Sequence, residues 1–257
     1  MAGRLASLIR SLAWVAGKGG DSGVAALESA AGLMIVAPHM DDDVLCCGGL
    51  LALRAGKGLP PPTVVYLTDG SRGTPGLERD ETLNARRKRE AREALEELGA
   101  GGARQVFLDL PDMGLKLDRA SAGLLAAEIE RERPGFLLAN PPFDSHQDHR
   151  AAAEIVLKAL TEAGKKGVRP RLFLYEVYTA MPRCGVVDIT GTAEAKRRAI
   201  RRHASQMLLH PYDEYVLGLN RFRGLQAAQL GEPGVRYAEG FLETGLDGLR
   251  DMCAAGD

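Results

Sequence analysis

The chain has 257 residues, of which 45% are hydrophobic and 26% charged, and its formal net charge is −1. This length and composition suit a globular protein with a full hydrophobic core. The balanced charge gives no indication of a nucleic-acid partner or an anionic membrane surface. No apolar run approaches the roughly 20 residues that span a bilayer.

Apolar runs of strand length alternate along the chain with longer segments of helical period. The expected strands cover residues 33–39, 63–70, 105–110, 135–140, 171–178 and 185–190. The expected helices cover residues 44–58, about 80–98, about 119–133 and about 149–163, and the remainder of the chain is mainly helical in pattern. Continuously apolar strands between helices are typical of a parallel sheet covered on both faces. We therefore expect an α/β fold, a Rossmann-like three-layer sandwich with a mostly parallel sheet.

The sequence shows no internal repeat and no convincing linker. We expect one domain over residues 1–257, with its core at about 31–245 and with residues 1–30 as an N-terminal helical extension. Arg4 and Arg10 interrupt the apolar residues of this extension, which favours an amphipathic helix over a secretory signal. We therefore expect the protein to be cytoplasmic. The four cysteines show no zinc-finger spacing or disulfide framework. Adjacent Cys46 and Cys47 are interpreted as small packing residues near a helix start.

A first polar cluster, "HMDDD" (39–43), follows the first expected strand directly. In parallel sheets, ligands bind outside the carboxyl ends of the strands. Three consecutive carboxylates repel one another, and a bound cation would offset that repulsion. The histidine and aspartates therefore predict a metal site. A simpler alternative is that Asp43, or another of the three, caps the helix that begins near Val44.

A second polar cluster, "FDSHQDHR" (143–150), follows the fourth expected strand. His146 and His149 are three residues apart, so one helical turn can present both imidazoles on one side. Asp148 between them can accept a hydrogen bond from a ring nitrogen. Alone, such histidines are more often solvated. Combined with the first cluster, they supply histidine and carboxylate donors, and a catalytic zinc site takes three protein ligands.

The residues "APHMDDDVLCCGG" and "SHQDH" resemble two motifs of the LmbE/PIG-L family of zinc-dependent N-acetylglucosaminyl deacetylases. Those motifs usually read A-H-P-D-D-E or P-H-P-D-D-E, and H-P-D-H. "YLTDGSRG", "RRKREAREALEELG" and "LPDMGL" resemble further family segments in the same order. The likeness therefore covers about residues 33–160, and more loosely "HASQM" (203–207) and "YAEGF" (237–241). Met40 and Asp43 replace the usual Pro and Glu, and Gln147 stands where Pro is common. None of these departures removes an implied ligand.

The resemblance implies one zinc ion per chain with three protein ligands, His39, Asp42 and His149. Asp41 matches the family's general base, which takes a proton from the attacking water and can return it to the leaving amine. His146 matches the histidine that stabilises the tetrahedral oxyanion. Asp148 is expected to orient a histidine, His146 in this interpretation, and to keep it protonated.

Substrate contacts are expected in the loops after the second and third strands. Arg72 lies where a cation can bind sugar hydroxyls or a phosphate, although a solvated loop arginine explains it equally well. Asp112 matches a family loop aspartate that can accept hydrogen bonds from sugar hydroxyls. Arg87 and Glu90, on the Arg/Glu-rich helix, can form a packed pair that supports the pocket, but a solvent-exposed pair at i,i+3 is the simpler interpretation.

The basic run "KRRAIRRH" (196–203) can be the docking site of an anionic carrier or the outer face of a helix. We interpret it as the outer face, with Ala199 and Ile200 directed inward.

These residues predict hydrolysis of the acetamide of an N-acetylglucosamine-like sugar, giving free amine and acetate. A family amidase that cleaves a larger acyl conjugate is a close variant. A metal-dependent phosphoesterase is a rival, but it needs two ions about 3.5–4 Å apart and therefore more ligands. A catalytically silent sugar-binding module is a third reading. The expected partner is a small amino-sugar or glycoconjugate, with no nucleic acid and no transmembrane segment. A homo-oligomer is compatible with the sequence.

Overall fold

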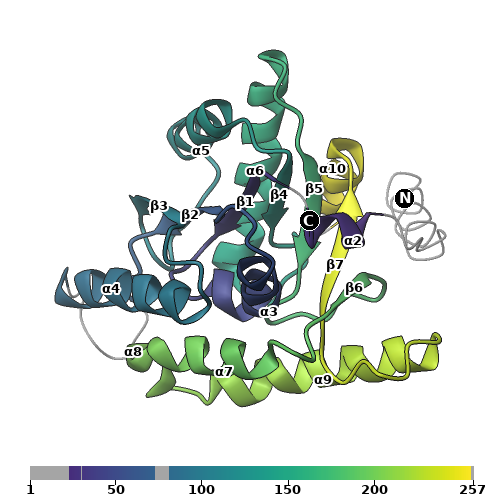
Figure 1. Ribbon diagram of the computed structural model, residues 1–257. Coiled ribbons are helices and arrows are strands. Elements are labelled where there is room, and N and C mark those ends of the chain that lie inside the picture. The colour runs from purple at the N-terminus through teal and green to yellow at the C-terminus, as the bar shows by residue number, and fades with distance from the viewer. Residues whose placement is uncertain (1–22, 30, 73–80, 256–257) are drawn as a thin grey trace.

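The fold is built on a seven-stranded sheet, seen in a computed structural model that describes residues 23–29, 31–72 and 81–255 (Figure 1). The strands are hydrogen-bonded in the order β3 (Arg104–Leu110), β2 (Thr63–Thr68), β1 (Leu33–Ala37), β4 (Phe136–Ala139), β5 (Arg171–Tyr175), β7 (Ala238–Thr244) and β6 (Gly185–Asp188). The pairs from β3 to β5 are parallel, and β7 runs antiparallel to both of its neighbours. The predicted α/β class with a mostly parallel sheet is confirmed.

Helices cover both faces of the sheet (Figure 1). On one face lie α5 (Arg119–Glu132), α6 (Gln147–Lys165) and α10 (Leu246–Ala255). On the other lie α3 (Asp42–Gly56), α4 (Glu81–Glu97), α7 (Ala193–Arg202), α8 (Ala204–Met207) and α9 (Tyr212–Gln229). The short α2 (Val24–Leu27) falls within the expected N-terminal extension, whose residues 1–22 and 30 lie outside the described residues. No helix in the described ranges is long and apolar enough to cross a membrane.

Side chains of the apolar strands pack into two separate hydrophobic clusters, one on each face of the sheet. In β1, Leu33, Ile35 and Ala37 belong to the cluster beneath α3 and α4, whereas Met34 and Val36 belong to the cluster beneath α5 and α6. Successive side chains of a strand point to opposite faces, so burial of both faces requires an unbroken apolar run. This is why β1 has no polar alternation.

The prediction that the C-terminal part of the chain is mainly helical is wrong for β7, which lies between β5 and β6 in the sheet. Glu239 and Gly240 interrupt its apolar pattern, and such residues are depleted in strands. Glu239 is nevertheless fully buried, because its carboxylate forms an ion pair of 2.7 Å with the equally buried Lys196 of α7. The preceding strand β5 ends at Tyr175, so residues 176–184 form a loop where the prediction extended the strand to 178.

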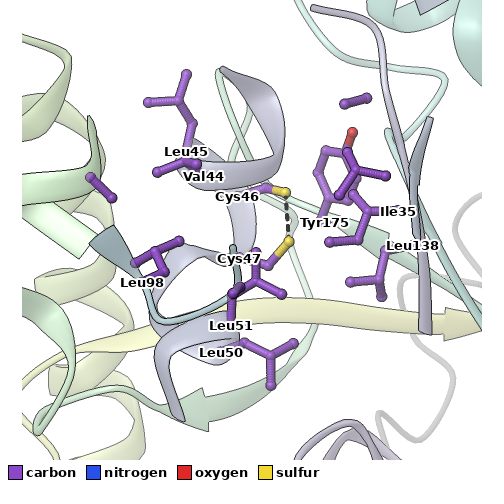
Figure 2. Packing of buried hydrophobic residues seen from close by; sticks show 14 of the residues in the cluster. Ile35, Val44, Leu45, Cys46, Cys47, Leu50, Leu51, Leu98, Leu138 and Tyr175 are labelled. Atoms are coloured by element: carbon purple, nitrogen blue, oxygen red, sulfur yellow. Dashed lines mark hydrogen bonds between the residues drawn. The ribbon is translucent and has the colours of Figure 1, made fainter. Parts of the chain in front are cut away.

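Cys46 and Cys47 are buried in the cluster between α3 and the sheet, as expected for packing residues (Figure 2). Their Sγ atoms are 3.1 Å apart, and both cysteines are free. Helix α3 departs from helical geometry at Cys47 (φ −136°, ψ 22°). Beyond this kink, the backbone N–H groups of Gly49 and Leu50 donate to the Glu239 carboxylate, both at 2.8 Å. Glu239 thus caps the second part of α3.

The order of the strands reverses between β1 and β4. The chain leaves β1 through α3 on one face and leaves β4 through α6 on the other (Figure 1). A strand-order reversal of this kind opens a cleft at the carboxyl ends of the two central strands, where ligands bind in open α/β sheets. Both polar clusters, at 39–43 and 143–150, follow these two strands.

Candidate metal centre

The turn from β1 into α3 presents His39 and Asp42 side by side. Helix α3 begins at Asp42, so the alternative that Asp43 caps a helix beginning near Val44 is wrong. Another of the three aspartates, Asp41, occupies the N-cap position, but its side chain makes no capping bond. The Oδ2 atom of Asp42 accepts from the backbone N–H of His39 at 2.9 Å and lies 3.2 Å from His39 Nδ1. Two carboxylates in the first turn also suit the positive end of the helix dipole.

The turn from β4 into α6 supplies two more imidazoles. Helix α6 begins at Gln147 with His146 as its N-cap, and Nδ1 of His146 accepts from the backbone N–H of Asp148 at 3.1 Å. His149 follows within the first helical turn and is completely buried. The helix thus directs both histidines toward the end of β1.

Three donor atoms from the two turns form a nearly equilateral triangle. Nδ1 of His39 and Nε2 of His149 are 3.4 Å apart, and Oδ2 of Asp42 lies 3.2 Å from the first and 3.3 Å from the second. Tetrahedral zinc ligands at about 2.0–2.1 Å from the metal are about 3.3–3.4 Å from one another. One ring nitrogen of His146 also lies within 4.8 Å of nitrogens of His39 and His149. These groups form a candidate metal site.

The second ring nitrogen of His39 faces away from this triangle, toward two carboxylates. Nε2 of His39 lies 3.3 Å from Asp148 Oδ2 and 3.4 Å from Asp112 Oδ1. The Asp148 carboxylate also accepts from the backbone N–H groups of Met113 at 2.8 Å and Leu115 at 3.2 Å. Met113 has a left-handed backbone (φ 56°), which turns the loop after β3 toward Asp148. Such carboxylates fix the tautomer that leaves Nδ1 available to a metal.

This arrangement corrects the expected partner of Asp148. Its carboxylate orients His39, whereas its contact with His146 is made by its backbone N–H. Because Nδ1 of His146 accepts that bond, the ring hydrogen of a neutral His146 is on Nε2. Burial, together with the charges of His39 and His149, lowers the pKa of His146 below its ordinary value. The charge of Asp148 acts in the opposite direction, so Asp148 favours a protonated His146 through its charge and not through a side-chain hydrogen bond. His146 can nevertheless donate from Nε2 while neutral.

His149 is supported in a similar way on its far side. Its Nδ1 atom lies 3.4 Å from Asp144 Oδ1 and 3.0 Å from the Asn140 side-chain amide. The hydroxyl of Tyr175 is in turn 2.7 Å from Asn140 Oδ1. This chain of contacts reaches from β5 to the imidazole and fixes the plane of its ring.

The carboxylates make the site strongly attractive to positive charge. Burial by itself disfavours a charged imidazole, but hydrogen bonds to Asp112, Asp148 and Asp42 raise the pKa of His39 well above its ordinary value. The pKa of His149 rises to about 9 against the same burial effect, through the charge of Asp42 and the hydrogen bond to Asp144. Burial would raise the pKa of Asp42, but the two imidazoles hold it well below the usual range. The carboxylates therefore favour positive charge at both imidazoles.

Asp41, the expected general base, is buried beside a buried arginine. Nη2 of Arg87 donates to Asp41 Oδ1 at 3.2 Å, and Nη1 of Arg87 donates to the carbonyl of Gly70 at 3.2 Å. Gly70 has φ 60°, and a Cβ atom there would lie 3.1–3.3 Å from the Arg87 guanidinium, so this close approach needs glycine. The interpretation of Arg87 and Glu90 as an exposed pair is wrong, since both are buried and Glu90 instead accepts from Ser205.

Asp43, which stands where the family motif has Glu, is fully buried against β2. Its Oδ2 atom accepts from the Tyr66 hydroxyl at 2.9 Å. Burial raises its pKa to about 8, and the neighbouring charges of Asp41 and Asp42 act in the same direction. The shorter side chain thus reaches a tyrosine of the sheet and adds no metal donor to the triangle.

Arg72 and Asp112 border a cavity of about 160 Å³ whose other lining residues are Ser71, Pro111, Met113 and Gly114. Asp112 is buried, and its Oδ2 atom accepts from the backbone N–H of Arg72 at 2.8 Å. Burial opposes ionisation, but contacts with His39, Arg72 and Arg87 lower the pKa of Asp112 to about 2. Asp112 therefore links this cavity to the metal donors. Arg72 is exposed at its edge.

Neither Asp144 nor His203 was predicted as a site residue, and a role for Arg87 beside the pocket was only the less favoured alternative. Asp144 lies within the second cluster, two residues before His146, and its position was the available signal. His203 is buried, and neither of its ring nitrogens has a hydrogen-bond partner within the described ranges. Arg87 lies in a run of basic residues. Only its position on the same helical face as the buried Ala91 and Ala94 could have indicated that it is buried.

A mostly parallel α/β sheet with histidine and aspartate side chains at its strand-order reversal defines an enzyme of Rossmann-like architecture with a candidate metal site. Residues 34–160 match the PIG-L family model, described as GlcNAc-PI de-N-acetylase. The chain belongs to this PIG-L family of N-deacetylases.

Its relatives are similar over most of their length. The chain is 32% identical over 225 residues to diacetylchitobiose deacetylase of Thermococcus kodakarensis, covering 81% of each chain. It is 30% identical over 230 residues to 4-oxalmesaconate hydratase of Pseudomonas putida, covering 80% of this chain and 86% of that one. The solved structure of N,N'-diacetylchitobiose deacetylase from Pyrococcus horikoshii has a TM-score of 0.72 at 26% identity, with 86% of each chain covered.

Proposed function

We propose that this protein is a zinc-dependent hydrolase that removes the N-acetyl group from an N-acetylglucosamine-containing sugar or glycoconjugate. The triangle of His39 Nδ1, Asp42 Oδ2 and His149 Nε2 is the observation that carries the proposal. Two of the similar proteins are deacetylases of diacetylchitobiose, a sugar of this class.

The donor set fits one zinc ion per chain. In addition to the triangle, the buried Oδ1 atom of Asp42 has no hydrogen-bond partner among the residues described, so it is available as a further ligand atom. When bound, zinc would polarise the amide carbonyl and lower the pKa of water from about 15.7 towards 7. Three protein ligands leave a position open for water and substrate, as in catalytic zinc sites.

Asp41 is the proposed base and acid of the reaction. Its Oδ1 atom accepts from Arg87, so Oδ2 is the oxygen proposed to take a proton from the attacking water. The same carboxyl group can then protonate the departing amine, since one group serves both steps when it is held in place between them. Arg87 keeps Asp41 from turning away and balances its charge.

His146 is the proposed donor to the oxyanion. Its Nδ1 accepts from Asp148, so Nε2–H is available for the oxygen on which negative charge develops. A positioned donor of this kind contributes roughly 3–4 kcal/mol to the transition state in hydrolases. Asp112 and Arg72, at the cavity beside His39, are the proposed contacts for sugar hydroxyls.

An acetate-release assay tests the proposal. Purified, zinc-loaded protein is incubated with N-acetylglucosamine glycosides, diacetylchitobiose, an N-acetylated nucleotide sugar and a larger N-acyl glucosamine, and both acetate and free amine are measured. We expect equal amounts of amine and acetate from at least one acetylated sugar. Because one relative is a hydratase, 4-oxalmesaconate is included. Hydration of this compound without release of acetate from any sugar would overturn the proposal, and two metal ions per chain would favour a phosphoesterase.

Zinc affinity is expected to increase with pH. In the zinc-free protein, the pKa values of His39 and His149 are both raised, that of His149 to about 9, so zinc competes with protons for these imidazoles. The apparent Kd should fall about 10- to 100-fold per pH unit from pH ~6.5 to ~9, one decade for each proton displaced. Chelator competition measures Kd, and titration calorimetry in two buffers counts the protons released. A Kd independent of pH would exclude these imidazoles as ligands.

The same protons make the stability of the zinc-free protein decrease with pH, whereas zinc affinity increases with pH. Because folding raises the pKa of His149 from 6.5 to about 9, its contribution to stability is complete below pH 6.5 and is lost as the pH rises through 9. The zinc-free protein should therefore unfold at lower urea concentration at pH ~9 than at pH ~6.5, and bound zinc should remove much of this difference.

We further propose, from the sequence, one domain over residues 1–257, a cytoplasmic location and compatibility with a homo-oligomer. Size-exclusion chromatography with light scattering tests the oligomeric state, and limited proteolysis tests the domain.

A further inference from the structure

Two tyrosines stand at the candidate site without any role in the chemistry proposed above. The ring of Tyr178 stacks on His149, with centroids 5.3 Å apart and an interplanar angle of 27°, and on His146, at 6.2 Å and 30°. The ring of Tyr212, the first residue of α9, lies 6.4 Å from that of Tyr178 and is inclined to it by 54°. The two hydroxyl groups also interact with each other. The two rings form an angled surface beside the imidazoles.

Tyr178 is 41% exposed although it contacts buried histidines. A large aromatic ring with one face on the imidazoles and an open remainder offers an apolar surface to a ligand. Asp112, which lines the cavity, contacts Nε2 of His39, whereas Tyr178 contacts the rings of His149 and His146. Polar and aromatic contacts are thus made by different histidines of the donor cluster.

Buried contacts hold the loop that carries Tyr178. In this 176–184 loop, Glu176 and Arg223 of α9 form a two-point ion pair, of which Nε to Oε2 measures 3.0 Å, and both side chains are buried. Arg223 also donates to the carbonyl of Met181 at 2.6 Å, and the N–H of Met181 donates back to Glu176 at 2.5 Å. These bonds close the loop on itself, so the position of Tyr178 is built into the fold.

A second contact ties the same loop to the metal centre. The backbone N–H of Ser145, the residue before His146, donates to the Thr179 hydroxyl at 3.0 Å. The residue after Tyr178 is therefore joined directly to the turn that carries the imidazoles. A ring held in this way loses little conformational entropy when a ligand stacks on it.

We propose that Tyr178 and Tyr212 form an aromatic wall on which the apolar face of the substrate's pyranose ring stacks. This inference rests on the proposed deacetylation, because the acetamide nitrogen is bonded directly to the sugar ring. A ring whose amide reaches the donor triangle must lie next to the imidazoles, where Tyr178 stands. The wall selects a cyclic amino-sugar over an acyclic acetamide of the same polarity.

The test separates aromatic stacking from simple packing. Tyr178→Leu keeps an apolar side chain but removes the ring, whereas Tyr178→Phe and Tyr178→Trp keep a ring. Tyr215→Leu is the matched control, since Tyr215 is 63% exposed on the outer side of the same helix as Tyr212. For methyl N-acetyl-β-D-glucosaminide, Tyr178→Leu should raise KM about 3- to 10-fold with kcat within twofold, as expected when stacking is lost equally from ground and transition states. The Phe, Trp and control variants should stay within twofold of wild type.

Binding without turnover gives an independent measurement. In the zinc-loaded Asp41→Asn background, Tyr178→Leu should raise the Kd of the glycoside about 3- to 10-fold and leave the Kd of acetate unchanged. Equal glycoside affinity in Tyr178→Leu and wild type would overturn the wall. Equal losses for glycoside and acetate would show a structural role for Tyr178 and would overturn it as well.

Two further results keep the proposals distinguishable. If Tyr178→Leu loses zinc or fails to fold, the Tyr178→Trp variant provides the test. Its tryptophan fluorescence should change on addition of the glycoside but not of acetate, measured against the wild-type protein, which has one tryptophan. Unchanged fluorescence on addition of the glycoside would overturn the wall. A wild type that binds the glycoside through Tyr178 but releases no acetate contradicts the deacetylase and leaves the wall standing. Acetate release by the wild type, together with an unchanged KM in Tyr178→Leu, supports the deacetylase and overturns the wall.

Discussion

Asp41→Asn is expected to reduce kcat for acetate release about 10²- to 10⁴-fold, the usual contribution of a positioned general base. Asparagine has nearly the same shape, and its side-chain oxygen can still accept from Arg87, which is 3.2 Å from the aspartate oxygen. The amide cannot take a proton from water at neutral pH. The variant should therefore stay folded and keep its zinc, because Asp41 is not one of the triangle atoms. Steady-state kinetics and metal analysis on the same preparation measure both quantities.

Asp251→Asn is the matched control, since it makes the same substitution at an exposed residue of α10 and should leave kcat unchanged. If Asp41→Asn hydrolyses the sugar as fast as wild type while binding one zinc, Asp41 is not the base. If it instead loses zinc, Asp41 belongs to the ligand set and the proposed division between Asp41 and Asp42 is wrong.

The sheet and the position of the site could be predicted because both depend on local patterns. The apolar runs at 33–39 and 135–140 contain β1 and β4, and the polar clusters at their ends do meet at the strand-order reversal. A strand buried on both faces has an unmistakable composition, and the carboxyl ends of neighbouring parallel strands share one edge. Proximity of His39 and His149 follows from these two facts alone.

The supporting contacts could not be predicted, because they join distant segments of chain. Asp148 turns its carboxylate to His39 and only its backbone to His146, a choice made by the first turn of α6 and by the left-handed Met113. Sequence spacing places Asp148 next to His146 but says nothing about the direction of its side chain. The buried pairing of Arg87 with Asp41 depends likewise on how α4 packs over the end of β2.

The buried charged side chains were the features of the structure that the sequence predicted least well. Ala199 and Ile200 of the basic run point inward, as expected, and both are buried. Lys196 stands three and four residues before them, on the same face of α7, so helical periodicity alone puts it inside. Charge argued against burial, since lysine is almost never fully buried unless paired. Its partner Glu239 is 43 residues away in the unpredicted strand β7.

Lys196→Met is expected to destabilise the zinc-loaded protein by about 3–5 kcal/mol, the usual cost of removing one partner of a buried ion pair. Both side chains are completely inaccessible and 2.7 Å apart, so the remaining Glu239 carboxylate would be buried without its cation. That carboxylate also accepts from Gly49 and Leu50 beyond the kink of α3, and the loss should therefore reach the helix that begins with Asp42. Urea unfolding with an unchanged m-value measures the difference in free energy.

Lys165→Met is the matched control, because the Lys165–Glu162 pair has the same 2.7 Å separation but its side chains are 66% and 37% exposed. Exposed pairs contribute about 0–1 kcal/mol, so this variant should unfold nearly as wild type does. Adding Glu239→Gln to Lys196→Met should recover part of the lost stability, since the unpaired charge is then gone while an oxygen still caps α3. A Lys196→Met variant as stable as the control would mean that water reaches Glu239. Glu239 would then hold α3 by its two backbone hydrogen bonds alone, without need of a cation.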